Sequence, residues 1–314
     1  MTVIQQFKTL LDLRDAFPTE QAAIDHLTAL RFGNGRFCPL CGCADEGKVK
    51  FMKAAGVVTN QLKCYSCRGK FSIKVGTIFQ DSKLPLRTWF AAIWMITNHP
   101  KGIASTTLAT DLGITQKSAW FVLHRLRHAA RTDSFNAPLS GEVEIDETFV
   151  GGREHNKHAS KKTSSKRGHG KDQKTIVMGL VQRGGEVRAG VIDNVRSNTL
   201  RHVVSAHVAK GATVYTDEHG GYNDLRHDYD HQRVSHRKGE YARGPVTTNG
   251  VESIWALFKR QYVGTHHWIS PKHMDAYLNE MTFRLNRRDM DKGHRVNALL
   301  GQIEGPMPWK VLTA

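Results

Sequence analysis

The 314-residue sequence predicts an α/β protein in which a mixed-sheet domain follows a cysteine-rich module and a helical region. Two Cys-x-x-Cys pairs lie between residues 38 and 67, residues 84–131 carry apolar side chains at helical spacing, and alternation typical of strands begins at residue 142. We therefore expect five parts: N-terminal helices over 1–34, the cysteine module over 35–82, the helical region over 83–135, the α/β domain over 140–290 and a C-terminal tail over 291–314.

The composition favours a nucleic-acid partner. The formal net charge is +16 and the isoelectric point is about 9.8, and such an excess of Lys and Arg repels itself unless a polyanion is bound. An anionic membrane surface is the alternative. The sequence has no run of about 18 apolar residues, no signal-peptide pattern and no lipidation motif. We therefore expect a cytoplasmic protein that uses no membrane and is nucleoid-associated when bound to DNA.

The five cysteines predict a metal site rather than a disulfide framework, because they are odd in number and clustered. Cys38 and Cys41 form one pair, Cys64 and Cys67 form the second, and Cys43 is left over. Each pair presents two thiolates from a tight turn, and two such turns suit one tetrahedral Zn²⁺. Four thiolates leave no open position, so we expect a structural Zn²⁺ in a zinc ribbon. The lysines of its strands form either a DNA-contacting face or a solvated one.

The helical region predicts a helix-turn-helix, in which Gly113-Ile114-Thr115 separates a helix over 105–112 from the next helix. In this next helix we expect an inward set: Ala119, Val122, Leu123 and Leu126. We expect an outward set: Lys117, Ser118, Phe121 and Arg125. Two helices joined by a short Gly-containing turn, with basic and hydroxyl residues outward on the second, are typical of DNA docking. Plain three-helix packing is the alternative, and the basic composition favours DNA.

The α/β domain is predicted from the change of periodicity after a linker at 136–141. A strand over 142–146 ends on Asp146, and residues 153–174 form a basic loop that contacts phosphates or stays mobile. The elements that follow are strands over 175–180 and 186–192, a helix over 197–208, a strand over 212–216 that ends on Asp217, a short strand over 232–236 and a last helix. Strand, hairpin, helix, strand, strand, helix is the order of a ribonuclease-H-like α/β fold.

Glu252 lies at the margin of the buried face of this last helix. A core-facing stripe recurs at the i, i+3, i+4, i+7 spacing: Val251, Ile254, Trp255, Phe258 and Tyr262. Lys259 follows Glu252 by nearly two turns, so we expect both side chains on one surface about 10 Å apart along the axis. Glu252 has two interpretations: it completes a capping box with Asn249 as the N-cap, or it belongs to an active site.

Asp146, Asp217 and Glu252 together predict a metal site. Phosphodiester cleavage requires that the attacking and leaving oxygens be stabilised together, which two divalent cations achieve by in-line clamping. Carboxylate oxygens are the ligands that Mg²⁺ prefers, and three carboxylates converge where cations offset their repulsion. Taken singly, each also fits a solvated surface charge, and Asp146 has Glu144 and Glu147 beside it. The combination of two strand-end aspartates with a helical glutamate favours a site.

The chain resembles the DDE transposases of bacterial insertion sequences, in the group that carries a zinc ribbon and is related to the Merlin elements. The resemblance covers nearly all of the chain after about residue 20. It is carried by the two Cys-x-x-Cys pairs, Phe71-Ser72-Ile73, Gly76-Thr77-Ile78-Phe79, Leu86-x-x-Trp89, the helix-turn-helix, Ile145-Asp146-Glu147-Thr148, Tyr215-Thr216-Asp217, Asn249-x-x-Glu252 and Phe283-Arg284-Leu285-Asn286-Arg287-Arg288. The 34 residues between Asp217 and Glu252 are the interval typical of this family, and Lys259 matches its basic residue seven positions after the Glu.

The resemblance implies a transposase that binds the terminal inverted repeats of its element, frees a 3′-hydroxyl by hydrolysis and joins it to target DNA. Asp146, Asp217 and Glu252 would hold Mg²⁺ or Mn²⁺, and Lys259 would contact a DNA phosphate. Some relatives use an Asn in place of the Glu, so Asn249 is a second candidate for the third ligand. We expect a homo-oligomer in the synaptic complex with double-stranded DNA. The alternatives are a ribonuclease-H-like nuclease or resolvase, and a non-catalytic DNA-binding regulator derived from a transposase.

Overall fold

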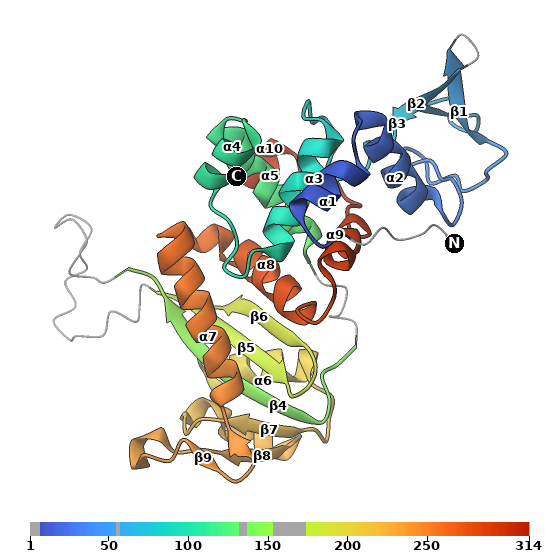
Figure 1. The fold of residues 1–314 in the computed structure, drawn as a ribbon. Helices are drawn as coiled ribbons and strands as arrows, with labels where there is room; N and C mark the ends of the chain where they lie inside the picture. The colour runs from blue at the N-terminus through green and yellow to red at the C-terminus, as the bar shows by residue number, and fades with distance from the viewer. Residues whose placement is uncertain (1–6, 55–56, 132–136, 153–173, 314) are drawn as a thin grey trace. The chain divides into compact units, whose positions relative to one another are not determined.

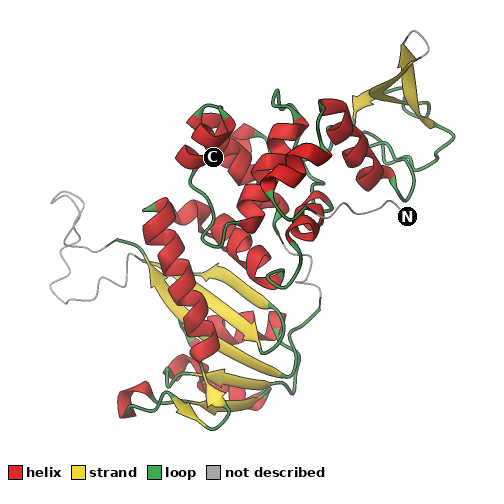
Figure 2. Cartoon of the chain, in the orientation of Figure 1, coloured by secondary structure: helices red, strands yellow, loops and turns green. Residues whose placement is uncertain are grey.

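The computed structural model describes residues 7–54, 57–131, 137–152 and 174–313. The chain divides into two compact units, of which the first combines Met1–Arg131 with Arg287–Ala314 and the second is Thr132–Asn286. Figure 1 traces the chain through both units, and Figure 2 separates their helices from their strands. Apart from Lys174, the expected basic loop lies outside the described residues.

The first unit is built from helices and one small antiparallel sheet (Figure 2). Its helices are α1 (Leu10–Ala16), α2 (Glu20–Phe32), α3 (Leu86–Asn98), α4 (Ser105–Leu112), α5 (Gln116–Ala129), α9 (Lys292–Leu300) and α10 (Trp309–Thr313). Its strands are β1 (Val49–Ala54), β2 (Val57–Cys64) and β3 (Lys70–Ser72), in the order β1-β2-β3. The three strands lie within the cysteine module of residues 35–82, and α4 has the bounds expected for the helix over 105–112.

Long-range contacts tie the C-terminal segment into the first unit. We expected a tail over 291–314, but the segment forms α9 and α10, and the α9 side chains Val296, Leu299 and Leu300 are buried. Arg31 of α2 forms an ion pair of 2.7 Å with Glu304. The apolar residues of α9 recur at i, i+3 and i+4, which is the spacing of a core-facing helix.

The second unit is a five-stranded mixed sheet with helices on both faces. Its strands are β4 (Glu142–Val150), β5 (Thr175–Gln182), β6 (Val187–Ile192), β7 (Thr213–Thr216) and β8 (Asp230–Arg233), in the order β6-β5-β4-β7-β8. A separate two-stranded ribbon pairs β9 (Ala242–Arg243) with β10 (Val246–Thr247). The antiparallel strands β4, β5 and β6 are followed by β7 and β8, which run parallel to β4 and β7 respectively. This mixed sheet is consistent with the predicted ribonuclease-H-like fold.

Two apolar layers cover the two faces of this sheet. The helical segments that build them are α6 (Ser197–His207), η4 (Gly220–His227), α7 (Asn249–Gln261) and α8 (Met274–Asn286). Val143 and Ile145 of β4 pack with Leu200 of α6, whereas Val177 of β5 packs with Trp255 of α7. Figure 1 shows α7 crossing the sheet on one side and α6 lying on the other. Among the described residues, no helix is long and apolar enough to cross a bilayer.

Candidate zinc site and candidate active site

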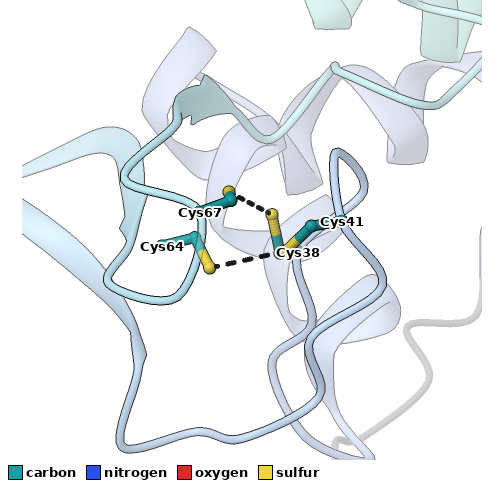
Figure 3. A group of neighbouring side chains, drawn as sticks. All are labelled: Cys38, Cys41, Cys64 and Cys67. Carbon is teal, nitrogen blue, oxygen red and sulfur yellow. Dashed lines mark hydrogen bonds between the residues drawn. The ribbon is translucent and has the colours of Figure 1, made fainter.

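The structure brings the four paired cysteines together (Figure 3). The Cys38 and Cys67 sulfurs are 3.8 Å apart, as are those of Cys41 and Cys64, and all four lie within 4.8 Å of one another. Four thiolates at about 2.3 Å from a tetrahedral Zn²⁺ would be about 3.8 Å from each other, so the donor set fits zinc. In the described part of the chain, no other three or more His, Cys, Asp or Glu side chains bring their ligand atoms together in this way.

The two cysteine turns have matching geometry. Gly42 follows the first pair with φ 74°, and Arg68 follows the second with φ 62°. The amide of Cys67 lowers the pKa of the Cys64 thiol, and the amide of Gly69 lowers that of the Cys67 thiol, because hydrogen bonds to sulfur stabilise the thiolate. Cys43 lies outside the group, where its sulfur accepts a hydrogen bond from Ser66.

The alternation of β4 separates its acidic residues onto two faces. We expected Asp146 at the end of this strand. It lies in the middle of the strand instead, because β4 continues to Val150. Glu144 and Asp146 share one face, since residues two apart in a strand point the same way. The Glu144 carboxylate accepts a hydrogen bond from the Val251 amide of α7, so this is the α7 face. Glu147 points to the other face, where its carboxylate is 3.8 Å from His219 Nδ1.

Asp217 follows the last residue of β7, the strand parallel to β4. The register pairs Glu142 with Thr213 and Glu144 with Tyr215, and two residues further along the two strands the chain reaches Asp146 and Asp217. Neighbouring strands are about 4.8 Å apart. Asp217 Oδ1 accepts a hydrogen bond of 2.8 Å from the His219 amide, which orients the carboxylate in the turn after the strand.

Glu252 is in the first turn of α7, but the predicted capping box is absent. The N-cap is Thr248 rather than Asn249, and its hydroxyl donates to Glu252 Oε1 at 2.9 Å. His236 Nε2 is 3.6 Å from the same oxygen. The Glu252 side chain is 42% exposed and reaches back to the N-cap hydroxyl, not to the N-cap amide that a capping box would use. Glu252 therefore keeps a contact at its own helix end beside its candidate role as a metal ligand.

The Asp146 carboxyl lies in a buried and acidic environment. Burial, followed by the negative charges of Glu147, Asp217 and Glu252, raises the pKa of the Asp146 carboxyl from 3.8 to about 7. Among the described residues, no Lys or Arg side chain forms an ion pair with Asp146 or Asp217. Carboxylate oxygens are the donors that suit a hard divalent cation such as Mg²⁺.

The two other predicted site residues lie on the surface of α7. Asn249 is exposed, and its carbonyl accepts a hydrogen bond from the Ser253 hydroxyl. Lys259 is exposed near the opposite end of the helix. The buried stripe between them contains Val251, Trp255 and Phe258, as the periodicity predicts.

The predicted helix-turn-helix face differs from our expectation. The inward residues of α5 are buried as predicted, but Arg125, expected outward, is only 5% exposed. Its guanidinium donates to the carbonyls of Ile78, Gln80 and Met307. The Phe121 ring is packed against Trp309 of α10, with 5.2 Å between ring centroids. Of this outward set, Lys117 is exposed and Ser118 is half-buried.

Sequence reasoning missed the buried contacts that hold α7 at the sheet. Glu144 is only 3% exposed, and Arg183 donates to it at 2.8 Å. Gly250 and Gly179 allow close approaches to Glu144 and Trp255 respectively. In the sequence, only Glu144, two positions before Asp146, and Gly250, next to Asn249, could have indicated these contacts. Neither residue identifies its distant partner.

Comparisons with known proteins agree with this architecture. Residues 138–286 match the family model of the ISXO2-like transposase domain, and residues 18–70 match that of the transposase zinc-ribbon domain. The chain is also 28% identical over 277 residues to an uncharacterized protein in transposable element ISH50 of Halobacterium salinarum, an alignment that covers 85% of this chain and 91% of the relative.

Proposed function

We propose that this chain, which contains a transposase zinc-ribbon domain and an ISXO2-like transposase domain, binds the terminal inverted repeats of its own element and catalyses metal-dependent DNA cleavage and strand transfer. The active species is a homo-oligomer assembled on the element ends. The zinc ribbon is a structural module, because all four of its ligand positions are thiolates.

The observation that supports the proposal is that three adjoining elements, β4, β7 and α7, each carry or lead into one of the three acids. Asp146 is on β4, Asp217 follows β7, and Glu252 is in the first turn of α7. The raised pKa of Asp146 includes contributions from both other acids, which supports their proximity. These three residues would hold Mg²⁺ or Mn²⁺, which when bound activates the nucleophile and stabilises the leaving oxygen.

The protein's own residues also account for substrate positioning. Lys259 is exposed on the helix that carries Glu252 and would bind a DNA phosphate near the cleaved bond. Thr248 and His236 orient the Glu252 carboxylate through contacts of 2.9 and 3.6 Å. The net charge of +16 supports a large electrostatic contribution to DNA affinity, and that affinity should fall steeply as the salt concentration rises.

Substitution of the three acids tests the proposal. Asp146→Asn, Asp217→Asn and Glu252→Gln should each abolish cleavage and strand transfer on DNA carrying the flanking repeats, while binding of these ends persists. Asp193→Asn is the control, because it removes one carboxylate charge from an exposed residue of the same unit. Full activity in any of the three acid variants removes that residue from the site.

Two further readouts separate the alternatives. If Asn249→Ala abolishes cleavage and Glu252→Gln does not, Asn249 is the third ligand. Nicking without joining under any metal condition would favour a nuclease or resolvase, and repeat binding without either reaction would favour a regulator.

A further inference from the structure

We propose that Glu144 is a positioning residue that fixes the first turn of α7, and with it Glu252, relative to Asp146. The inference rests on the proposed function, because it concerns the geometry of that metal site. Glu144 does not itself face the substrate; it acts through the helix that carries Glu252.

The first turn of α7 obtains its cap from a distant strand. The opening N–H groups of a helix have no partner within the helix, and the N-cap Thr248 makes no side-chain hydrogen bond to them. The Val251 amide donates instead to Glu144 Oε2 at 3.1 Å. A buried carboxylate at this end of a helix is also stabilised by the helix dipole. Val251 directly precedes Glu252, so this contact holds the backbone next to the candidate ligand.

Arg183 fixes the other oxygen of the same carboxylate. Its Nε donates to Glu144 Oε1 at 2.8 Å, and its Nη2 donates to the Thr247 carbonyl at 3.2 Å. The guanidinium also lies 4.3 Å from the centroid of the Tyr215 ring. Arg183 therefore joins β4 to the residue just before the N-cap of α7. Each oxygen of the Glu144 carboxylate has its own hydrogen-bond donor, so the position and the orientation of the carboxylate are both fixed.

The contacts of Glu144 determine both the position of the first turn of α7 along β4 and the rotation of α7 about its own axis. Glu144 and Asp146 are about 6.8 Å apart along the same face of β4. Successive helix residues are 100° apart around the axis, so holding the Val251 amide over Glu144 also determines which way Glu252 points. Release of this contact would let the first turn rotate and would change the distance from Glu252 to Asp146.

Gly250 is the residue that allows Glu144 to come this close. A Cβ at position 250 would be 2.6 Å from Glu144 Oε2 and 3.1 Å from its Cδ. Ala normally stabilises a helix relative to Gly, so this Gly is explained by the carboxylate next to it. At Gly264, beyond the end of α7, an added Cβ would meet no atom within 4 Å, which makes it a matched control.

Mn²⁺ binding to the full-length, zinc-loaded chain without DNA tests the inference. We expect Gly250→Ala to raise the Kd for Mn²⁺ about tenfold, measured from the EPR signal of free Mn²⁺, and Gly264→Ala to leave it unchanged. Glu144→Asp withdraws the carboxylate by about one bond length from the Val251 amide and from Arg183, and it should raise the Kd in the same direction. A change in thermal stability with wild-type Mn²⁺ affinity would show that the contact is only structural and would overturn the inference.

A second variant keeps the test decisive if Gly250→Ala does not fold. Arg183→Lys retains the positive charge but loses the two-pronged contact with Glu144 and Thr247, and we expect its Kd for Mn²⁺ to rise about threefold. Wild-type affinity in this variant would overturn the inference. Failure of the proposed function has a different signature: the wild-type chain would then show no Mn²⁺ binding that Asp146→Asn removes.

Discussion

Replacement of Gly179 by Ala tests how α7 is seated on the sheet. Gly179 is paired with Asp146 in the β4–β5 register. A Cβ at this position would be 2.6 Å from Trp255 Cζ2, 2.8 Å from Trp255 Cη2 and 3.3 Å from Val251 Cγ2. Trp255 is 3% exposed, so the indole cannot move outward without displacing α7.

Overpacking of this kind costs about 1–3 kcal/mol, and we expect a loss of about 2 kcal/mol in the free energy of unfolding. For a unit of this size, that loss lowers the unfolding temperature by about 4–8 °C. Differential scanning calorimetry of the full-length chain would measure the shift. Because Glu252 is one turn before Trp255 on the same helix, strand cleavage should decrease more than DNA binding.

Two companion variants make the result interpretable. At Gly190, also in the sheet, an added Cβ would have its nearest neighbour at 4.0 Å, the Asp275 carboxylate, so Gly190→Ala should be close to neutral. Trp255→Phe removes the two ring atoms that the new methyl meets and should restore part of the stability lost in Gly179→Ala. An unchanged unfolding temperature in Gly179→Ala would refute the close packing of α7 on β5.

Three more predictions follow from the two candidate metal sites and from α5. Cys64→Ser should reduce bound zinc from one per chain to none by atomic emission, whereas Cys43→Ser should retain it; zinc retained in the former contradicts a four-cysteine site. The pKa of Asp146 is about 7 in the folded chain, whereas the ordinary pKa of an aspartate, which we take for the unfolded chain, is 3.8. The metal-free folded chain therefore binds an extra proton between about pH 4 and 7, and its stability falls as pH rises through this window. Without added Mg²⁺ or Mn²⁺, Asp146→Asn should therefore raise the unfolding temperature at pH 8 and hardly change it at pH 5; equal effects at both pH values would argue against this titration. Arg125→Ala leaves three carbonyls without their donor and should cost about 3 kcal/mol or more in urea unfolding, whereas Lys117→Ala should weaken end binding at unchanged stability; the reverse pattern would restore Arg125 to the DNA-contacting surface.

Features that depend on spacing along the chain were predictable. Each cysteine pair forms its own turn, so the grouping of Cys38, Cys41, Cys64 and Cys67 required only that one hairpin join the two turns. The apolar stripe of α7 follows from helical periodicity, and the order of strands and helices in the second unit follows from alternation and turn residues.

Features that depend on a distant partner were not predictable in the same way. The sequence suggested a capping box at Asn249 and Glu252, but the Val251 amide is bound by Glu144, 107 residues away. Arg125 was expected outward from its position on α5, but carbonyls at residues 78, 80 and 307 bind its guanidinium. A helical wheel contains no information about segments that pack on it from elsewhere in the chain.

By itself, the sequence determined the classes of chemistry present: four thiolates suited to zinc, a basic chain suited to nucleic acid, and three acids suited to a divalent cation. Only the tertiary structure decided which acids share a face. Asp146 and Glu147 are adjacent in sequence, but the pleat of β4 directs Asp146 toward α7 and Glu147 toward His219. The placement of the first turn of α7 on β4 was likewise decided by a buried carboxylate, because the contact between Glu144 and the Val251 amide joins residues that no local pattern connects.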